Sequence, residues 1–166
     1  MDLITFSCLF TKGWYLKNYK HMNIKIKQIA FDGAEHKKEI DLRYKVLRRP
    51  IGLNYTQEQL DAEKDEFHFA AFDGEKLAGC LLMKAIDKDE IKMRQVAVDE
   101  TYQGKGVGKA LVLYSEKFAA ENGFSVITLH ARKTAVPFYA HLGYEIVGEE
   151  FIEVSLPHFK MKKDKL

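Results

Sequence analysis

Cysteine is scarce in this chain of 166 residues. The two thiols, Cys8 and Cys80, stand far apart and have no neighbours at the spacing of zinc ligands or of a redox pair. Cys80 lies within an apolar run, where we expect it to be a small buried hydrophobic residue. This usage favours a reducing cytoplasm, and it predicts a domain that folds without disulfides and holds no metal.

A surplus of charge of one sign is also missing. Lys and Arg number 26 against 24 for Asp and Glu, which leaves a formal net charge of +2. Because basic and acidic residues alternate along most of the chain, no broad basic face is expected for the phosphates of a nucleic acid. The composition therefore excludes nucleic acid as a partner and is that of an ordinary globular domain.

No apolar run is long enough to span a membrane. Residues 3–10 form a short apolar run, but it follows Asp2 rather than a basic region and precedes no small-residue cleavage site. Met22 opens a segment, residues 22–27, with the form of a natural protein start. We therefore expect residues 1–21 to be a dispensable extension, residues 22–166 to be the functional domain, and no membrane to be a partner.

The spacing of apolar residues predicts one domain of mixed strands and helices, without repeats or linkers. A capping-box pattern begins at Thr56, and the pair Asp73-Gly74 predicts a hairpin turn. The first helix carries Ile40, Tyr44 and Leu47 at helical spacing and is closed by Pro50; a later one carries Val107, Leu111, Tyr114 and Phe118 on one face. The predicted strands are 23–29, 67–72, 76–83, 90–98, 126–130, 144–147 and 159–162, and the predicted helices are 34–48, 57–64, 108–122 and 135–142.

A glycine-rich turn, Gln-Gly-Lys-Gly-Val-Gly at residues 103–108, lies between a predicted strand and a predicted helix. Its glycines allow a sharp turn and leave backbone N–H groups unscreened, and the helix adds the positive end of its dipole. Such a turn is typical of a phosphate or pyrophosphate site, with Lys105 and Lys109 at its rim.

Two other anion-binding motifs do not fit the spacing of this turn. A P-loop requires Gly-Lys-Ser/Thr, but Lys109-Ala110 follows Gly108 and no hydroxyl is placed to hold magnesium. A dinucleotide fingerprint requires Gly-x-Gly-x-x-Gly early in a βαβ unit, whereas this turn has a shorter last spacing and follows several strands. A nucleotide-binding domain is therefore not predicted.

The turn and a second motif together resemble the GNAT superfamily of N-acetyltransferases. Gln-x-x-Gly-x-Gly, beginning at Gln103 after the strand 93–98, looks like the family's acetyl-CoA pyrophosphate loop. Further along, Ala-Val-Pro-Phe-Tyr ending at Tyr139, followed by Leu-Gly-Tyr ending at Tyr144, is similar to the family's Ala-x-x-x-Tyr-x-x-x-Gly-Phe/Tyr helix. The resemblance covers residues 23–163, and the second motif with the residues around His158 looks like a bacterial subgroup.

The resemblance implies an α/β, or mixed α+β, single domain. Its sheet would be mixed and mostly antiparallel, flanked by helices and splayed where acetyl-CoA binds. Acetyl-CoA would be the acetyl donor, attacked directly by a neutral amine. The Val96 amide would stabilise the oxyanion, and Tyr139 would be the general acid that faces the CoA sulfur. The implied cofactor contacts are Val96, Ala97, Val98, Gln103, Gly104, Lys105, Gly106, Val107, Gly108, Lys109, Arg132, Ala135 and Phe138.

The general base is where the sequence departs from the family. Some members carry a glutamate at the position of Lys92, which cannot serve as a carboxylate base. A second departure is Arg132, where many members carry an asparagine that helps to hold the CoA arm; this arginine would contact a cofactor phosphate or lie in solvent. His130 is our first candidate for the base because it titrates near neutral pH, and bulk water could also serve. The other candidates are Glu90, Glu149, Glu150 and His158.

The acceptor amine is not determined by the sequence. The resemblance implies an acceptor site formed by about residues 43–64, where Arg48 and Arg49 stand among several acids. A small-molecule amine and a peptide amine both remain open, and a homodimer is compatible with the family. The alternative function is a non-catalytic acyl-CoA-binding or regulatory module with the same fold.

Overall fold

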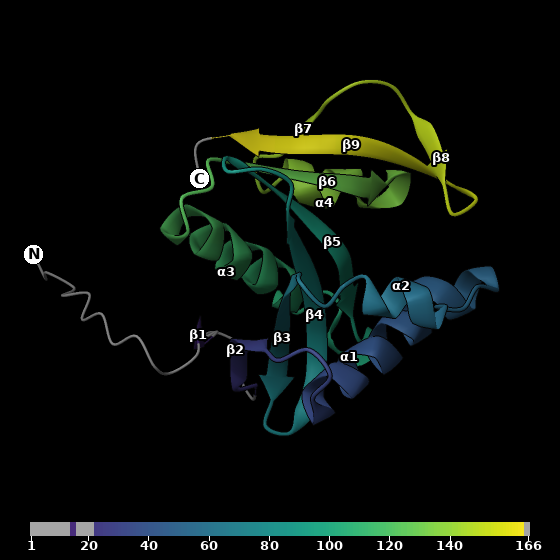
Figure 1. Ribbon diagram of the computed structural model, residues 1–166, viewed down its shortest axis with the longest axis vertical. Coiled ribbons are helices and arrows are strands. Elements are labelled where there is room, and N and C mark those ends of the chain that lie inside the picture. The colour runs from purple at the N-terminus through teal and green to yellow at the C-terminus, as the bar shows by residue number, and fades with distance from the viewer. Residues whose placement is uncertain (1–13, 16–21, 165–166) are drawn as a thin grey trace, which may run out of the picture.

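The chain folds around one mixed sheet with helices on both faces, as a computed structural model of residues 14–15 and 22–164 shows (Figure 1). The strands are β1 Trp14–Tyr15, β2 Ile24–Ile29, β3 Phe67–Asp73, β4 Lys76–Ala85, β5 Glu90–Val98, β6 Val126–Arg132, β7 Glu145–Ile146, β8 Phe151–Glu153 and β9 Leu156–Asp164. The α-helices are α1 Ala34–Arg43, α2 Gln57–Asp61, α3 Val107–Glu121 and α4 Val136–Ala140. A π-helical turn, η1 Tyr44–Arg48, and three 3₁₀ turns, η2 Arg49–Ile51, η3 Glu100–Tyr102 and η4 Lys133–Ala135, complete the helical segments.

The expected extension is described only at Trp14–Tyr15, which pairs with β2 as strand β1. The rest of residues 1–21, including Cys8, lies outside the described residues. Cys80 is fully buried in β4, as its apolar surroundings predicted. Within the described residues, no helix is long and apolar enough to cross a membrane.

The strands follow the order β1-β2-β3-β4-β5-β6-β9-β7, with β8 paired to β9. All neighbours are antiparallel except β5 and β6. That parallel pairing begins at Glu90↔Val126 and stops at Met93↔Leu129, whereas β6 stays paired with β9 as far as Arg132. The sheet therefore opens between β5 and β6 along their second halves, and Figure 1 shows β6 and β9 turned away from β5.

The two faces of the sheet carry different helices. Helix α3 packs on β3, β4 and β5 from one side, and α1 packs on β4 and β5 from the other (Figure 1). Gly79 of β4 permits the close approach of α3, because a Cβ there would lie 2.9 Å from Leu111 Cδ1 and 3.2 Å from Val107 Cγ1. The apolar face predicted for α3 is confirmed, since Val107 and Leu111 are buried in the core and Tyr114 and Phe118 pack against it.

The first predicted helix differs from the observed one in helix type and in the side chains that it buries. It is α-helical only to Arg43, and the chain then continues through η1 and η2 to Ile51. The apolar residues at helical spacing do not form its buried face, and Tyr44 is 38% exposed. The buried positions are instead His36, Glu39, Leu42 and Arg43. Burying these charged groups is possible because they neutralise one another, which apolar periodicity cannot reveal.

The C-terminal hairpin between β8 and β9 was not predicted from the sequence, which indicated only a last strand. Its two-residue turn, Val154-Ser155, has positive φ at both positions, 44° and 63°. Turns of this kind favour glycine or asparagine, and neither is present. By contrast, the Thr56 capping box and the hairpin between β3 and β4 are confirmed, although Asp73 pairs with Lys76 and the two turn residues are therefore Gly74 and Glu75.

Candidate functional site

A cleft of about 620 Å³ lies where β5 and β6 separate. Its walls come from both strands, from η1, from the segment around α4, and from the β8–β9 hairpin. Because the strands no longer bond to each other here, the cleft offers both main-chain groups and side chains to a ligand. The lining residues are Val46, Leu47, Arg48, Lys92, Met93, Arg94, Gln95, Val96, Gln103, Leu129, His130, Ala131, Arg132, Thr134, Ala135, Tyr139, Glu153, Val154 and His158.

A bulge in β5 forms one wall of the cleft. The β4–β5 register jumps from Cys80↔Ala97 to Leu82↔Arg94, and neither Gln95 nor Val96 has a partner in the β5 ladders. Gln95 has a φ of 52°, which is costly for a residue with a side chain, and its Oε1 accepts a hydrogen bond from the Tyr55 hydroxyl at 2.8 Å. The bulge leaves Val96 outside the ladders, and Val96 is among the residues that line the cleft.

The glycine-rich turn lies at the N-terminus of α3. Gly104 and Gly106 have φ values of 69° and 82°, which favour glycine. The first helical bond of α3 runs from the Ala110 amide to the Gly106 carbonyl at 3.0 Å, so the amides of residues 107–109 make no bond within the helix. Three amides at a helix N-terminus suit a phosphate oxygen, which fits the pyrophosphate site expected from the sequence.

Phe138 packs against this turn from α4. A Cβ at Gly108 would lie 3.6 Å from Phe138 Cζ and 3.5 Å from Val98 Cγ2, which are ordinary van der Waals distances and show that the two side chains lie beside the turn. Val107 and Ala97 are both buried, so neither offers a side chain to a ligand. Gln103 lines the cleft and donates from Nε2 to the Val98 carbonyl at 3.1 Å, linking the turn to the end of β5.

Tyr139 lies in α4 and lines the cleft. Its ring is buried and packs edge-on against Phe138 and Tyr144. Burial raises the pKa of the Tyr139 hydroxyl well above its ordinary value of 10.0, because a phenolate there would be poorly solvated. Among the described residues the hydroxyl has no hydrogen-bond partner, so its proton is available to a group that enters the cleft.

His130 stands between an acid and a cation on the opposite wall. Its Nδ1 lies 3.1 Å from Glu153 Oε2, and its Nε2 lies 3.1 Å from Lys92 Nζ. A carboxylate accepts and an ammonium donates, so the ring is neutral, with its proton on Nδ1 and a lone pair on Nε2. Burial, followed by the charge of Lys92, lowers the pKa of His130, and burial also lowers the pKa of Lys92.

The other base candidates are less well placed. Glu90 accepts a hydrogen bond from Thr128 at 2.7 Å, and Glu150 pairs with Lys133 at 2.6 Å. His158 lines the cleft, but its Nδ1 donates to the Leu156 carbonyl at 2.8 Å. Glu149 is exposed outside the cleft. Among the described acids only Glu153 lines the cleft, and sequence reasoning missed it because its place depends on the unpredicted β8–β9 hairpin.

The residues expected at the site fall into two groups. Six of them line the cleft: Val96, Gln103, His130, Arg132, Ala135 and Tyr139. The remaining residues of the turn, together with Ala97, Val98, Lys109 and Phe138, are not part of its lining, although Phe138 and the turn meet beside it. Arg132 is partly buried, and its Nη2 donates to the Leu47 carbonyl at 2.9 Å.

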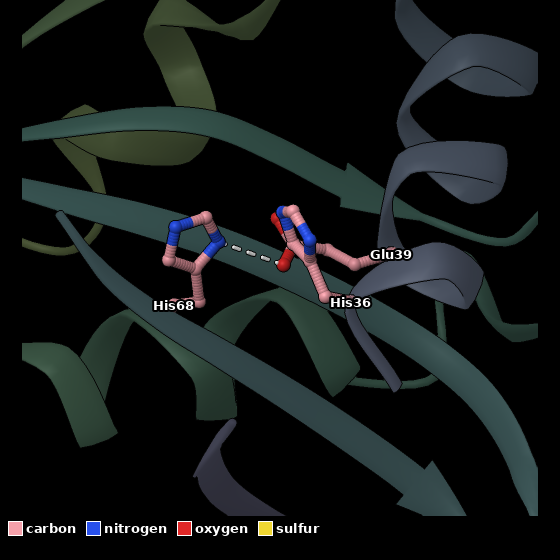
Figure 2. A group of neighbouring side chains, drawn as sticks. All are labelled: His36, Glu39 and His68. Carbon is pink, nitrogen blue, oxygen red and sulfur yellow. Dashed lines mark hydrogen bonds and ion pairs between the residues drawn. The ribbon is translucent and has the colours of Figure 1, made fainter. Parts of the chain in front are cut away.

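A second cluster of polar side chains lies under α1, where His36, Glu39 and His68 bring their ligand-type atoms within 4.8 Å of one another (Figure 2). The carboxylate of Glu39 and both ring nitrogens of His68 are already used in hydrogen bonds, and of these ligand-type atoms only His36 Nε2 has no partner among the described residues. His36 Nδ1 accepts from the Asp32 amide at 3.1 Å, which places its proton on Nε2. Glu39 accepts from His68 Nδ1 at 2.9 Å and from Arg43 at 2.9 Å.

The whole of this buried cluster is a balanced set of charges. Arg43 also bonds both oxygens of Glu63, at 2.9 and 2.8 Å, and His68 Nε2 donates to the Glu63 carbonyl at 3.1 Å. Since both ring nitrogens of His68 face acceptors, this histidine carries a positive charge. Two carboxylates therefore meet two cations beneath α1, and the cluster stabilises the fold rather than binding a ligand.

Comparisons with known proteins agree with this fold and cleft. The family model of the GNAT acetyltransferase domain matches residues 42–165. The chain is 34% identical over 111 residues to the uncharacterized N-acetyltransferase YjcF of Bacillus subtilis (strain 168), across 66% of this chain and 79% of that protein.

Two solved structures share the fold at low sequence identity. Escherichia coli ElaA superposes with a TM-score of 0.73 and 20% identity, covering 85% of this chain and 99% of that chain. A GNAT family acetyltransferase from Elizabethkingia anophelis, solved with acetyl-CoA bound, gives a TM-score of 0.67 and 15% identity over 85% and 97% of the two chains. Together with the family match, the arrangement of sheet, cleft and helix-terminal turn leads to one conclusion: this chain belongs to the GNAT family of acetyltransferases and is an acyltransferase enzyme.

Proposed function

We propose that the protein transfers the acetyl group of acetyl-CoA to a primary amine by direct attack, without an acyl-enzyme. The observation that carries this proposal is the opening of the sheet after Met93, which joins the bulged backbone of β5, the Tyr139 hydroxyl and His130 in one cleft. The acetyl-CoA bound in the Elizabethkingia anophelis structure, which has the same fold, supports the assignment of the donor.

Acetyl-CoA would lie between the separated strands. Its pantetheine arm would pair with the backbone of Val96, Ala97 and Val98 as an added strand does. Its pyrophosphate would accept hydrogen bonds from the amides at the start of α3, with Lys105 and Lys109 adding charge at the rim. Ala135 and Phe138 would border the arm from the side of α4.

The reaction would use three groups of this chain. The amine nitrogen attacks the thioester carbon, and the Val96 amide stabilises the oxyanion of the tetrahedral intermediate. His130 Nε2 takes the proton that the amine loses, directly or after Lys92 moves aside. When the carbon–sulfur bond breaks, the Tyr139 hydroxyl protonates the leaving thiolate. The products are the N-acetylated amine and CoA.

Thermal unfolding with and without ligands tests the proposal. At a hundred times its dissociation constant, acetyl-CoA or CoA should add about 2.7 kcal/mol of stability, a rise in Tm of roughly 5–10 °C for a domain of this size. ATP and NAD at the same concentration should leave Tm unchanged. If CoA release from acetyl-CoA then depends on an added amine, the enzyme is a transferase. CoA binding without transfer to any amine would instead favour the non-catalytic acyl-CoA-binding module.

A further inference from the structure

Two arginines in the cleft have no acidic partner. Arg48 of η1 and Arg132 of β6 both line the cleft, and among the described residues neither forms an ion pair. The other partly or fully buried arginines are neutralised, Arg43 by Glu39 and Glu63, and Arg94 by Glu66. An arginine withdrawn from water without a carboxylate is costly, so this pair indicates an anion that is supplied from outside the chain.

The two guanidinium groups are held close to each other by the fold. Arg132 Nη2 donates to the carbonyl of Leu47, the residue next to Arg48, at 2.9 Å. The Arg48 guanidinium stacks over the Tyr55 ring at 4.7 Å from its centroid, and its Nε is buried without a hydrogen-bond partner. Burial, followed by the charge of Arg48, lowers the pKa of Arg132, which agrees with their proximity. An incoming anion can therefore meet two forked donors that are already positioned.

The acids of the same region do not offset this charge. Glu63 is committed to Arg43 beneath α1, and Glu58, Asp61 and Asp65 are exposed outside the cleft lining. Lys92 adds further positive charge to the cleft, whereas the charge of Arg94 is offset by Glu66, and Glu153 is the single carboxylate in the lining. The arginines and acids that stood together in the sequence are thus separated by the fold, and the cleft is cationic.

We propose that Arg48 and Arg132 bind a carboxylate of the acceptor, so that the substrates are amines that also carry a carboxylate group. This inference rests on the proposed function, since it names the acceptor of the same cleft. A carboxylate can accept two parallel hydrogen bonds from the planar guanidinium group of an arginine, a geometry that the ammonium group of a lysine cannot provide. The phosphates of the donor would have their own site at the start of α3, a helix that packs on the face of the sheet opposite α1 (Figure 1).

Matched pairs of acids and amides test this inference in the full chain. We would measure kcat/KM for glycine, β-alanine, γ-aminobutyrate, L-leucine and glycylglycine, and for the carboxamide of each. In parallel, the CoA-saturated protein would be melted with the N-acetylated form of each acid and amide, which reports binding without turnover. The variants are Arg48→Gln, Arg48→Lys and the control Arg49→Gln, which removes the same charge from an exposed neighbour outside the cleft.

We expect the wild type to prefer the acid in at least one pair by about tenfold or more, the range of a hydrogen bond to a charged group. Arg48→Gln should lower kcat/KM for that acid by about 10- to 100-fold and leave its amide unchanged. Arg48→Lys should keep part of the preference, and Arg49→Gln should keep all of it. In the melting experiment only the acid product should stabilise the protein, and Arg48→Gln should abolish that shift.

Three results would overturn the inference. Equal kcat/KM values for the acid and the amide in every pair, with the stabilisation by CoA retained, would overturn the inference and leave the proposed function intact. Loss of CoA stabilisation in Arg48→Gln would assign the arginines to a phosphate of the donor instead. Absence of any CoA stabilisation in the wild type would overturn the proposed function, and this inference with it.

Discussion

Tyr139 and His130 face one cleft with opposite protonation properties. Burial raises the pKa of Tyr139, so the phenol keeps its proton, while the pKa of His130 is lowered, so the imidazole keeps a lone pair. These protonation states at neutral pH suit the acid and base roles proposed for the two residues. The spacing of the family motif predicted the tyrosine, whereas the partners of His130 come from distant strands that local patterns do not relate.

Replacing Tyr139 with phenylalanine should lower kcat by about a hundredfold or more, because the thiolate would leave without a general acid. CoA stabilisation should be unchanged, since the ring and its packing remain. Tyr144→Phe is the matched control: it removes a hydroxyl from the neighbouring ring, which is not part of the cleft lining, and it should turn over normally. Steady-state kinetics and thermal shifts provide both readouts, and a Tyr139→Phe enzyme with the wild-type kcat would refute the role.

The pH dependence of kcat/KM should report His130. Its lowered pKa predicts that activity is lost as pH falls through a value below 6.5. The charge of Lys92 lowers this pKa and the hydrogen bond to Glu153 raises it. Lys92→Met should therefore move the acidic limb of the profile to higher pH, and Glu153→Gln should move it to lower pH. A limb that stays in place in both variants would show that another group is the base.

At the scale of elements, a hairpin could be predicted from the sequence only where its turn carries residues that favour the required backbone conformation. The hairpin between β3 and β4 has a glycine, Gly74, at its position of positive φ and was predicted, whereas the β8–β9 hairpin turns through Val154 and Ser155, which disfavour positive φ. The opening between β5 and β6 was expected only through the family resemblance, because it depends on which strands pair. The buried face of α1 was missed because its charges are satisfied by residues distant in sequence.

Ser155→Gly should stabilise the protein by about 0.5–1 kcal/mol, since glycine removes the cost of a φ of 63° at the hairpin turn. Ser125→Gly is the control: Ser125 is also exposed but lies outside the positive-φ positions. There the added backbone freedom should leave stability unchanged or lower it by up to about 1 kcal/mol. Chemical denaturation of the three proteins measures the difference, and a Ser155→Gly protein less stable than the wild type would contradict the assigned strain.

At the scale of the whole molecule, the sheet separates two different tasks. Helix α3 and the glycine-rich turn occupy one face, and α1 covers the other with its buried charges (Figure 1). The cleft opens where the sheet divides, and in the proposed reaction the acetyl donor and the amine would meet there. The buried charges under α1 include His68, so the stability of this face depends on the protonation of that histidine.

Stability should fall as pH rises above neutrality because of His68. Burial alone would lower its pKa, but the hydrogen bond and charge of Glu39 outweigh burial, and the pKa is raised above 6.5. Its contribution is therefore complete below pH 6.5 and is lost as pH rises through the folded-state pKa, at no more than about 1.4 kcal/mol per pH unit. His36, whose pKa is lowered by burial first, acts with the opposite sign and below pH 6.5, outside this window. Denaturation of the wild type and His68→Gln across pH 6–9 isolates the effect. We expect the variant to be less stable at pH 6 and the gap to narrow toward pH 9, and a constant gap would show that His68 is neutral in the folded protein.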